Sequence, residues 1–490
     1  MPAFFLVRLF RGSSELKGGF NLAPVKKAKR KYEIDMCSGP IFKKVVLFAF
    51  PLMISGILQL LYNAADIIVV GQFAGSDAMA AVGSTSSLIN LLTNVFIGLS
   101  MGVSVLISKF YGAGQQKDIF ETVHTAIGLS LICGVLIGAL GFIFAGDMLE
   151  LMDSPDNVLD KATLYMQIYF LGMPAFMLYN FGSAALRAVG DIRRPLYYLT
   201  IAGIVNILLN LLFVIVFNMS VMGVAIATVA SQIISAFLII WCLIKTDGVC
   251  RLSLKEIKIY PRKLGSILRI GLPAGIQGSL FSISNVLIQS SVNSFNSIAM
   301  AGNTAAASLE GFVYTSMNAM SQASLSFTSQ NFGAGQMKRI KRIAGICLLS
   351  VTVLGLSLGM LITLLGHPLS RIYSPDPAVI EVSISRLSII CTTYFLCGIM
   401  EVFVGLLRGM GQSLLPTSVS LLGACVFRII WIYTVFAAHH TLTVLYISYP
   451  VSWLLTSLIH FICFLFVYNY NKRKLNRIKE ETAPALDAPA

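Results

Sequence analysis

The chain has 490 residues, of which 56% are hydrophobic and only 12% are charged. An ordinary soluble domain has roughly 25% charged residues, so this composition excludes a protein whose whole surface faces water. The net charge of +14 does not indicate a nucleic-acid partner, because the basic residues are spread between apolar segments instead of forming one domain. The expected surroundings are a lipid bilayer.

Apolar segments of membrane-spanning length recur along the whole chain. Each has about 20 or more residues, which is the length that a helix needs to cross about 30 Å of hydrocarbon. We therefore predict an all-α integral membrane protein with twelve transmembrane helices, arranged as two six-helix parallel repeats around a central cavity. The predicted spans lie at about 43–71, 79–110, 119–146, 159–189, 195–217, 221–244, 264–291, 298–330, 341–366, 379–410, 414–437 and 441–469.

The two halves of the chain repeat one another. Residues 111–117 read YGAGQQK and residues 332–338 read FGAGQMK, and Pro51 recurs in the same way as Pro273. Six spans per half is an even number, so both halves enter the membrane from the same side. This arrangement is typical of carriers whose halves rock around a central site.

The charges between the spans predict the orientation. Most basic residues fall on one side of the predicted spans, and the opposite loops are acidic or nearly uncharged, with Arg371 and Arg386 as minor exceptions. By the positive-inside rule both termini are cytoplasmic, so we expect a multi-pass protein of the cell (inner, cytoplasmic) membrane.

The same pattern gives the predicted domains. The first 35 residues have no small-residue cleavage site after their short apolar start, so we expect a loose cytoplasmic extension and no cleaved signal. The predicted divisions are an N-terminal extension at 1–40, a six-helix bundle at 41–245, a cytoplasmic linker at 246–262, a second bundle at 263–470 and a cytoplasmic tail at 471–490.

Polar side chains inside the predicted spans mark the first candidate site. Asp66 lies about 32 Å along the first span from Val45, and an ionised side chain inside a membrane is costly and usually functional. Asn206 and Asn210 share one face of the fifth span, and Thr228 lies about 10 Å into the sixth. These oxygens suit a sodium ion, and Asp66 alone can carry a proton. The structural alternatives are an interfacial aspartate and asparagines that hydrogen-bond neighbouring helices.

At these residues the chain resembles the multidrug and toxic compound extrusion (MATE) family, whose members are cation-coupled exporters. The resemblance covers about residues 36–470. It is carried by the segment that ends NAAD at Asp66, the paired GAGQ loops, LRAVGD at 186–191, NILLN at 206–210 and VMGVAIAT at 221–228. It implies a cation site at Asp66, Asn206, Asn210 and Thr228.

The chain also departs from the family pattern. Many similar members have Asp where Asn210 stands, so this site has one carboxylate and a weaker field for sodium. Some members have Glu eight residues after the proline of the seventh span, where this chain has Phe281. The coupling acid of the second half is therefore missing from that place.

The second half has its own polar positions, which we expect to line a substrate cavity. Glu310 lies about 17 Å into the eighth span and Arg428 about 20 Å into the eleventh. The expectation is that Glu310 contacts a cationic drug or acts as a proton-linked switch. The structural alternative for Glu310 and Glu401 is a buried ion pair of one of them with Arg428. A methionine wall accommodates solutes of many shapes, although methionine in a helix is more often core filler. The full predicted cavity set is Gln277, Ser284, Asn285, Glu310, Met317, Glu401 and Arg428.

These residues favour a proton- or sodium-driven antiporter that exports amphipathic organic cations. The glycine-rich loops lack GxxxxGK[ST], and no GxSxG or HExxH motif occurs, so neither an ATPase nor another enzyme is indicated. We expect no cofactor beyond the coupling ion, and a monomer as the working unit. A flippase for lipid-linked precursors, or another small-solute carrier of the same superfamily, is the alternative. A channel or scaffold is a third class.

Overall fold

The computed structural model describes residues 32–151 and 156–482, and every regular element in these ranges is helical. The predicted extension before residue 32 and the end of the tail after 482 lie outside the described residues. The first half contains α2 (Ile41–Phe73), α3 (Ser76–Ala113), α4 (Gln116–Glu150), α5 (Asp156–Leu171), α6 (Met173–Ala188), α7 (Arg193–Leu211), the π-helical η1 (Leu212–Val216) and α8 (Ser220–Lys245).

A connection with one short 3₁₀ turn, η2 (Leu254–Glu256), leads into the second half. That half contains α9 (Pro261–Asn293), α10 (Ser297–Gly333), α11 (Met337–Leu364), α12 (Gly366–Arg371), α13 (Pro377–Thr393), α14 (Phe395–Gly409), α15 (Leu414–Ser420), η3 (Leu421–Val426), α16 (Phe427–Trp431), η4 (Ile432–Phe436) and α17 (Leu442–Thr482). Both η3 and η4 are π-helical.

These helices make twelve crossings when consecutive pieces are joined: α5 with α6, α7 with η1, α13 with α14, and α15 through η4. Eight single helices of the described chain are long and apolar enough to span a membrane, and the bent pair α13 and α14 makes a ninth. Of the remaining crossings, α9 and α10 are long helices that carry many polar residues. The serine, asparagine, glutamine and glycine residues of α9 and α10 lower the mean hydropathy of these two helices, which explains why hydropathy alone undercounts the crossings.

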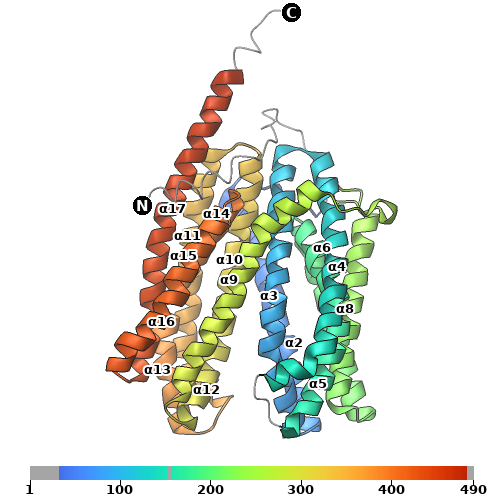
Figure 1. Cartoon of the computed structure of the whole chain (residues 1–490). Coiled ribbons are helices and arrows are strands. Elements are labelled where there is room, and N and C mark those ends of the chain that lie inside the picture. Colours follow the sequence, from blue (N-terminus) through green and yellow to red (C-terminus); the bar gives the residue numbers. More distant parts are fainter. Residues whose placement is uncertain (1–31, 152–155, 483–490) are drawn as a thin grey trace, which may run out of the picture.

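The molecule consists of two helix bundles that meet along α3, α9 and α10. Figure 1 shows α9 crossing diagonally in front of α3 between the two bundles. The crossing is close because Gly98 and Gly102 on α3 face Gly271 and Gly275 on α9. A Cβ added at Gly98 would lie 2.2 Å from the Gly275 backbone nitrogen. The small-residue spacing therefore brings two backbones into contact, as it does in other membrane helix pairs.

The repeated GAGQ turns close the bundle at the end drawn uppermost in Figure 1, which we call the basic face. Gly112 of the first repeat meets the carbonyl oxygen of Gln330, and Gly333 of the second meets that of Lys109. A Cβ at either glycine would lie 1.9 Å from the facing oxygen. Each repeat thus packs its glycine on the other repeat's backbone, and the motif recurs because both sides of this contact need it.

Residues 32–40, which we call the strap, run across the basic face and contact both halves. Ile34 donates a backbone hydrogen bond to Gly190 at 3.2 Å. On the other half, Asn331 donates to the Met36 carbonyl at 3.1 Å, and Arg339 donates to the Ser38 carbonyl at 2.7 Å. Met36 is completely buried. The strap is therefore held in place, because its backbone carbonyls accept hydrogen bonds from side chains of the second half.

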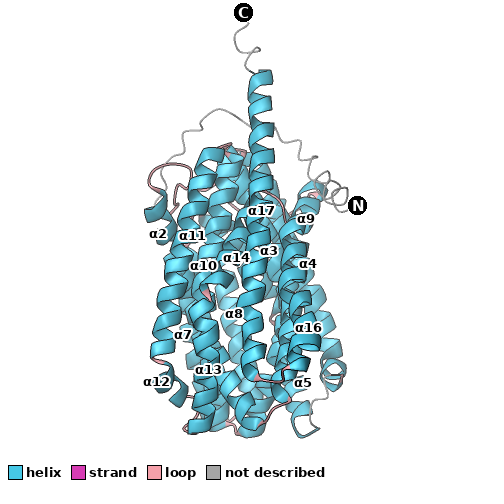
Figure 2. Cartoon of the chain, turned by 90° about the vertical axis from the view of Figure 1, so that its left-hand side faces the viewer, coloured by secondary structure: helices cyan, strands magenta, loops and turns pink. Residues whose placement is uncertain are grey.

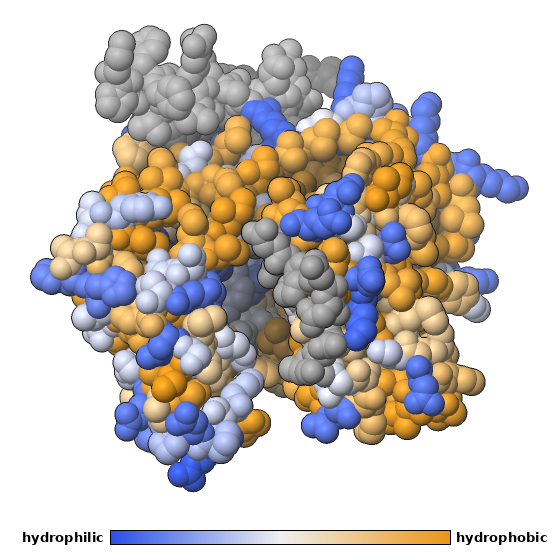
Figure 3. All heavy atoms as spheres, turned by 60° about the horizontal axis from the view of Figure 1, so that its bottom comes forward, coloured by the Kyte–Doolittle hydropathy of each residue, from blue (hydrophilic) through white to orange (hydrophobic). Residues whose placement is uncertain are grey.

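At the opposite face the surface is open in the middle. Figure 3 brings the bottom of the Figure 1 view forward, and the space-filling surface there has a hollow between its two sides. In the side view the helices run roughly parallel along the length of the molecule (Figure 2). Many large apolar side chains remain exposed on their outer surfaces, including Leu136, Ile143 and Phe237. An exposed apolar surface of this extent suits lipid contact.

Candidate functional site

The first-half site is a ring of four polar side chains from α2, α7 and α8. Asn210 Nδ2 donates to Asp66 Oδ1 at 2.5 Å and to Asn206 Oδ1 at 3.3 Å. Thr228 Oγ1 donates to Asp66 Oδ2 at 3.4 Å, and Asn206 Nδ2 lies 3.4 Å from Thr228 Oγ1. The structure therefore brings together all four residues that the sequence singled out.

Local sequence explains why these groups meet. Asn206 and Asn210 are one turn apart on α7, so both point to the same side of that helix. The helix then continues as the π-helical η1 from Leu212, two residues after Asn210. Single π turns inside helices often occur at functional sites, because the extra residue changes which side chains face inward.

The arrangement is chemically suited to a small cation. Asp66 is 8% exposed and Asn210 is fully buried. No described residue donates a hydrogen bond to the Asn210 side-chain oxygen. Carboxylate, amide and hydroxyl oxygens are the ligands that hard cations prefer, and a buried carboxylate without a cationic partner favours either a bound ion or a proton. The residues present therefore fit both coupling ions.

Two tyrosines near this site were missed in the sequence. Tyr165 and Tyr169 on α5 lie near Asp66, and their ring centroids are 6.2 Å apart. The two tyrosines are one helical turn apart, so their rings form a single aromatic wall. Their spacing was visible in the sequence, but aromatic residues are common in spans and gave no separate signal.

The second half contains a cavity of about 360 Å³ lined by α9, α10, α13, α14, η3, α16 and α17. Of the predicted cavity residues, Asn285, Glu310, Glu401 and Arg428 line it. The main charged group that the prediction omitted is Arg386, which also lines this space.

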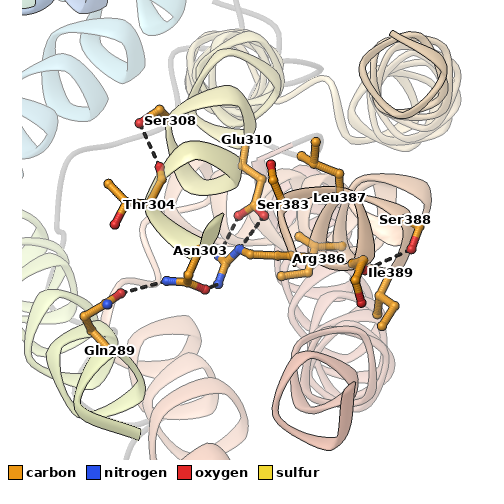
Figure 4. A network of polar contacts seen from close by, with 12 residues as sticks. Gln289, Asn303, Thr304, Ser308, Glu310, Ser383, Arg386, Leu387, Ser388 and Ile389 are labelled. Atoms are coloured by element: carbon orange, nitrogen blue, oxygen red, sulfur yellow. Dashed lines mark hydrogen bonds and ion pairs between the residues drawn. The ribbon is translucent and has the colours of Figure 1, made fainter. Parts of the chain in front are cut away.

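Glu310 and Arg386 form a buried ion pair (Figure 4). Arg386 Nε and Nη2 donate to the two carboxylate oxygens of Glu310 at 2.7 and 2.8 Å, and Nη1 donates to Asn303 Oδ1 at 2.5 Å. Asn303 in turn donates to Gln289 at 2.8 Å. The assignment of Arg386 to an outer loop is wrong, because it lies nine residues into α13 with its side chain buried.

Arg428 does not pair with either acid, so that expectation is also wrong. Its Nε donates to Ser452 Oγ at 2.9 Å, and its guanidinium lies 4.1 Å from the ring centroid of Tyr449. Glu310 is occupied by Arg386 instead. Glu401 lines the cavity, and the arginine that acts on it electrostatically is Arg408.

Three predicted cavity residues lie elsewhere. Gln277 accepts a hydrogen bond from Arg408 at 2.9 Å, nearer the contact between the halves. Met317 is 1% exposed and belongs to the core of the second half, where its sulfur faces Gly355 and Gly398. Ser284 is buried on α9 and is not among the lining residues. Polar or methionine-rich helix positions that look alike in the sequence therefore face different neighbouring helices in the structure.

Comparison with known proteins agrees with this architecture. The MatE family pattern matches residues 51–212 and again residues 273–434, one stretch in each bundle. The chain belongs to the MATE family. MATE proteins are membrane transporters, so the chain is a transporter and not an enzyme.

Among its relatives, the probable multidrug resistance protein YoeA of Bacillus subtilis is 29% identical over 78% of this chain and 84% of its own length. The FAD transporter of Shewanella oneidensis is 26% identical over 75% of this chain and 82% of its own. A solved structure described as the outward-facing conformation of a multidrug resistance MATE transporter of the MOP superfamily has 21% identity. It superposes with a TM-score of 0.85 over 91% of this chain and 100% of that one.

Proposed function

We propose that this MATE protein is an antiporter that couples the inward movement of a proton or sodium ion at Asp66 to the export of amphipathic organic ions. The observation that carries the proposal is the closed ring of Asp66, Asn206, Asn210 and Thr228, which buries one carboxylate among neutral oxygens. Such a group changes its free energy strongly when a cation binds or leaves, so it suits coupling.

The fold supports alternating access. The halves are in backbone contact at the basic face, where Gly112 meets Gln330 and Gly333 meets Lys109, and the opposite face is hollowed (Figure 3). Rocking the bundles about the crossing of α3 and α9 would open the basic face and close the other one. We take the basic face to be cytoplasmic by the positive-inside rule, with the chain in the cell membrane and both ends inside.

The substrates proposed here are small organic ions, in line with relatives named for multidrug resistance and for FAD transport. Cationic drugs are the class expected from the sequence. Of the two cavity acids, Glu401 is the one without an ion pair and is open to such a drug, because Arg386 binds both carboxylate oxygens of Glu310. The chain would work as a monomer, since both halves of the transport path belong to one polypeptide.

A lipid-linked precursor flippase has less support. That function favours several free arginines in the cavity to hold a diphosphate. The cavity does contain a second arginine, Arg386, but its donors already bind Glu310 and Asn303. Only Arg428 remains, and one guanidinium is a weak match for two phosphate groups.

The test is drug efflux from proteoliposomes under separately imposed proton and sodium gradients. Wild type is expected to accumulate a fluorescent substrate against its gradient when one of the two ions is supplied. Asp66→Asn keeps the size and most hydrogen bonds of the side chain and is expected to lose this stimulation. A matched control is Asp376→Asn, because Asp376 is an exposed N-cap residue of α13 outside the site. Equal stimulation of wild type and Asp66→Asn would show that the proposal is wrong.

A further inference from the structure

Arg428 is a buried cation in the cavity of the second half that has no acid beside it. It is 6% exposed, and it lies on α16 between two π-helical segments. Its Nε is held by Ser452, and the face of its guanidinium lies over the Tyr449 ring. No carboxylate of the described residues is within 4 Å of it.

Neither acid of the cavity pairs directly with Arg428. Glu310 accepts both of its ion-pair hydrogen bonds from Arg386, and Glu401 has no ion pair among the described residues. Arg428 is therefore a cation of the cavity lining without a carboxylate in contact with it. An uncompensated charge inside a membrane protein is expensive, and such residues usually belong to a substrate path.

The part of Arg428 that is free faces the cavity. The structure gives its two terminal nitrogens no acceptor among the described residues, and the side chain is part of the cavity lining. The bond to Ser452 and the stacking on Tyr449 fix the plane of the guanidinium. A fixed guanidinium presents paired donors that match the oxygens of a carboxylate or a phosphate.

Three aromatic rings lie beside Arg428. The rings of Tyr394 and Trp453 stack with centroids 5.0 Å apart at an angle of 24°, and Trp453 also lies 5.6 Å from Tyr449. All three rings line the cavity. Such a cluster offers a planar ligand ring a stacking surface next to the arginine.

We propose that the second-half cavity binds organic anions, with a carboxylate or phosphate on the terminal nitrogens of Arg428 and a planar ring against Tyr394, Tyr449 and Trp453. The inference rests on the proposed transport function and names the class of organic ion that the second-half cavity takes. The acidic group of the substrate replaces the counterion that the protein does not supply.

The test is equilibrium binding to the purified full chain in detergent, without any ion gradient. Riboflavin 5′-phosphate and riboflavin share one ring system, and only the first carries a phosphate. Wild type is expected to bind the phosphate at least about tenfold more tightly, which is the scale of a charged hydrogen bond. Arg428→Gln is expected to remove this difference and to leave riboflavin unchanged, and Arg428→Lys to retain part of it. Rhodamine 123, a planar cation, should bind Arg428→Gln no more weakly than wild type.

Equal binding of the two flavins by wild type would overturn the proposal without any variant. So would a monodisperse Arg428→Gln protein that keeps the preference for the phosphate. Asp376→Asn, at the exposed N-cap of α13 outside both sites, is expected to bind like wild type in this assay. Because the binding assay uses no ion gradient, failure of the proposed antiport would appear as a lost gradient effect with anion binding intact, and failure of the present inference as the reverse.

Discussion

Replacing Arg386 by Met is predicted to destabilise the second half through the group that it leaves behind. Glu310 would lose both of its ion-pair hydrogen bonds, at 2.7 and 2.8 Å, and Asn303 would lose a third at 2.5 Å. The side chains of Glu310 and Arg386 are 7% and 6% exposed, so water is a poor substitute for the missing partner.

The expected loss is about 3–5 kcal/mol in the free energy of unfolding, the range for breaking a buried pair by removing one partner. The double variant Arg386→Met with Glu310→Gln leaves no buried charge. We expect it to recover about 1–3 kcal/mol relative to the sum of the single losses, which is the coupling energy of residues in one network.

The assay is equilibrium unfolding in mixed detergent and denaturing-detergent micelles, followed by tryptophan fluorescence. Arg371→Met is the matched control, because Arg371 is an exposed arginine at the end of α12, and its loss should stay within about 0.5 kcal/mol. Strictly additive losses in the double variant would refute the reasoning, because they would mean that the two side chains do not stabilise one another.

Two further predictions concern the basic face. Gly112→Val places a Cβ 1.9 Å from the Gln330 carbonyl oxygen and is expected to lower the free energy of unfolding by about 1–3 kcal/mol in the same assay. The control Gly345→Val, at a glycine with open space around it, should cost nearly nothing. Equal losses in the two variants would contradict the contact between the halves. Arg339→Gln removes the side chain that donates to three strap carbonyls, so backbone amides of the strap should exchange hydrogen faster in mass spectrometry, and the exposed control Lys341→Gln should not change them. Unchanged exchange in Arg339→Gln would show that the strap is held without it.

The first-half site was predictable because its members obey simple helix geometry. Asn206 and Asn210 are one turn apart, and the rise per residue placed Asp66 and Thr228 at comparable depth. The rise per residue along three predicted spans was enough to predict that these side chains lie close together. The apolar segments and the internal repeat gave the fold in the same way.

The second half was less predictable because its charges depend on which helices are neighbours. Arg386 was counted with the outer loops although it lies near the start of the predicted span at 379–410, since a span boundary read from hydropathy carries an error of several residues. The expected partner of Glu310 or Glu401 was Arg428, which lies at similar depth to Glu310 on a different helix. Depth along a helix is readable from sequence, but the direction of a side chain around the bundle depends on packing.

The strap was missed for a related reason. Its residues have no helical period and precede the first span, which is the usual sequence of a loose end. What holds them are single donors such as Asn331 and Arg339, which lie about 300 positions later in the chain. No local sequence pattern predicts hydrogen-bond partners that are so far away in the chain.

The central claim is that Asp66 couples an ion to transport and is not needed for the movement of substrate itself. The most direct measurement compares two assays on Asp66→Asn in proteoliposomes: exchange of labelled for unlabelled substrate without any gradient, and uphill accumulation under an imposed ion gradient. The account predicts that exchange continues and uphill accumulation is lost. Uphill accumulation at the wild-type level in this variant would contradict it.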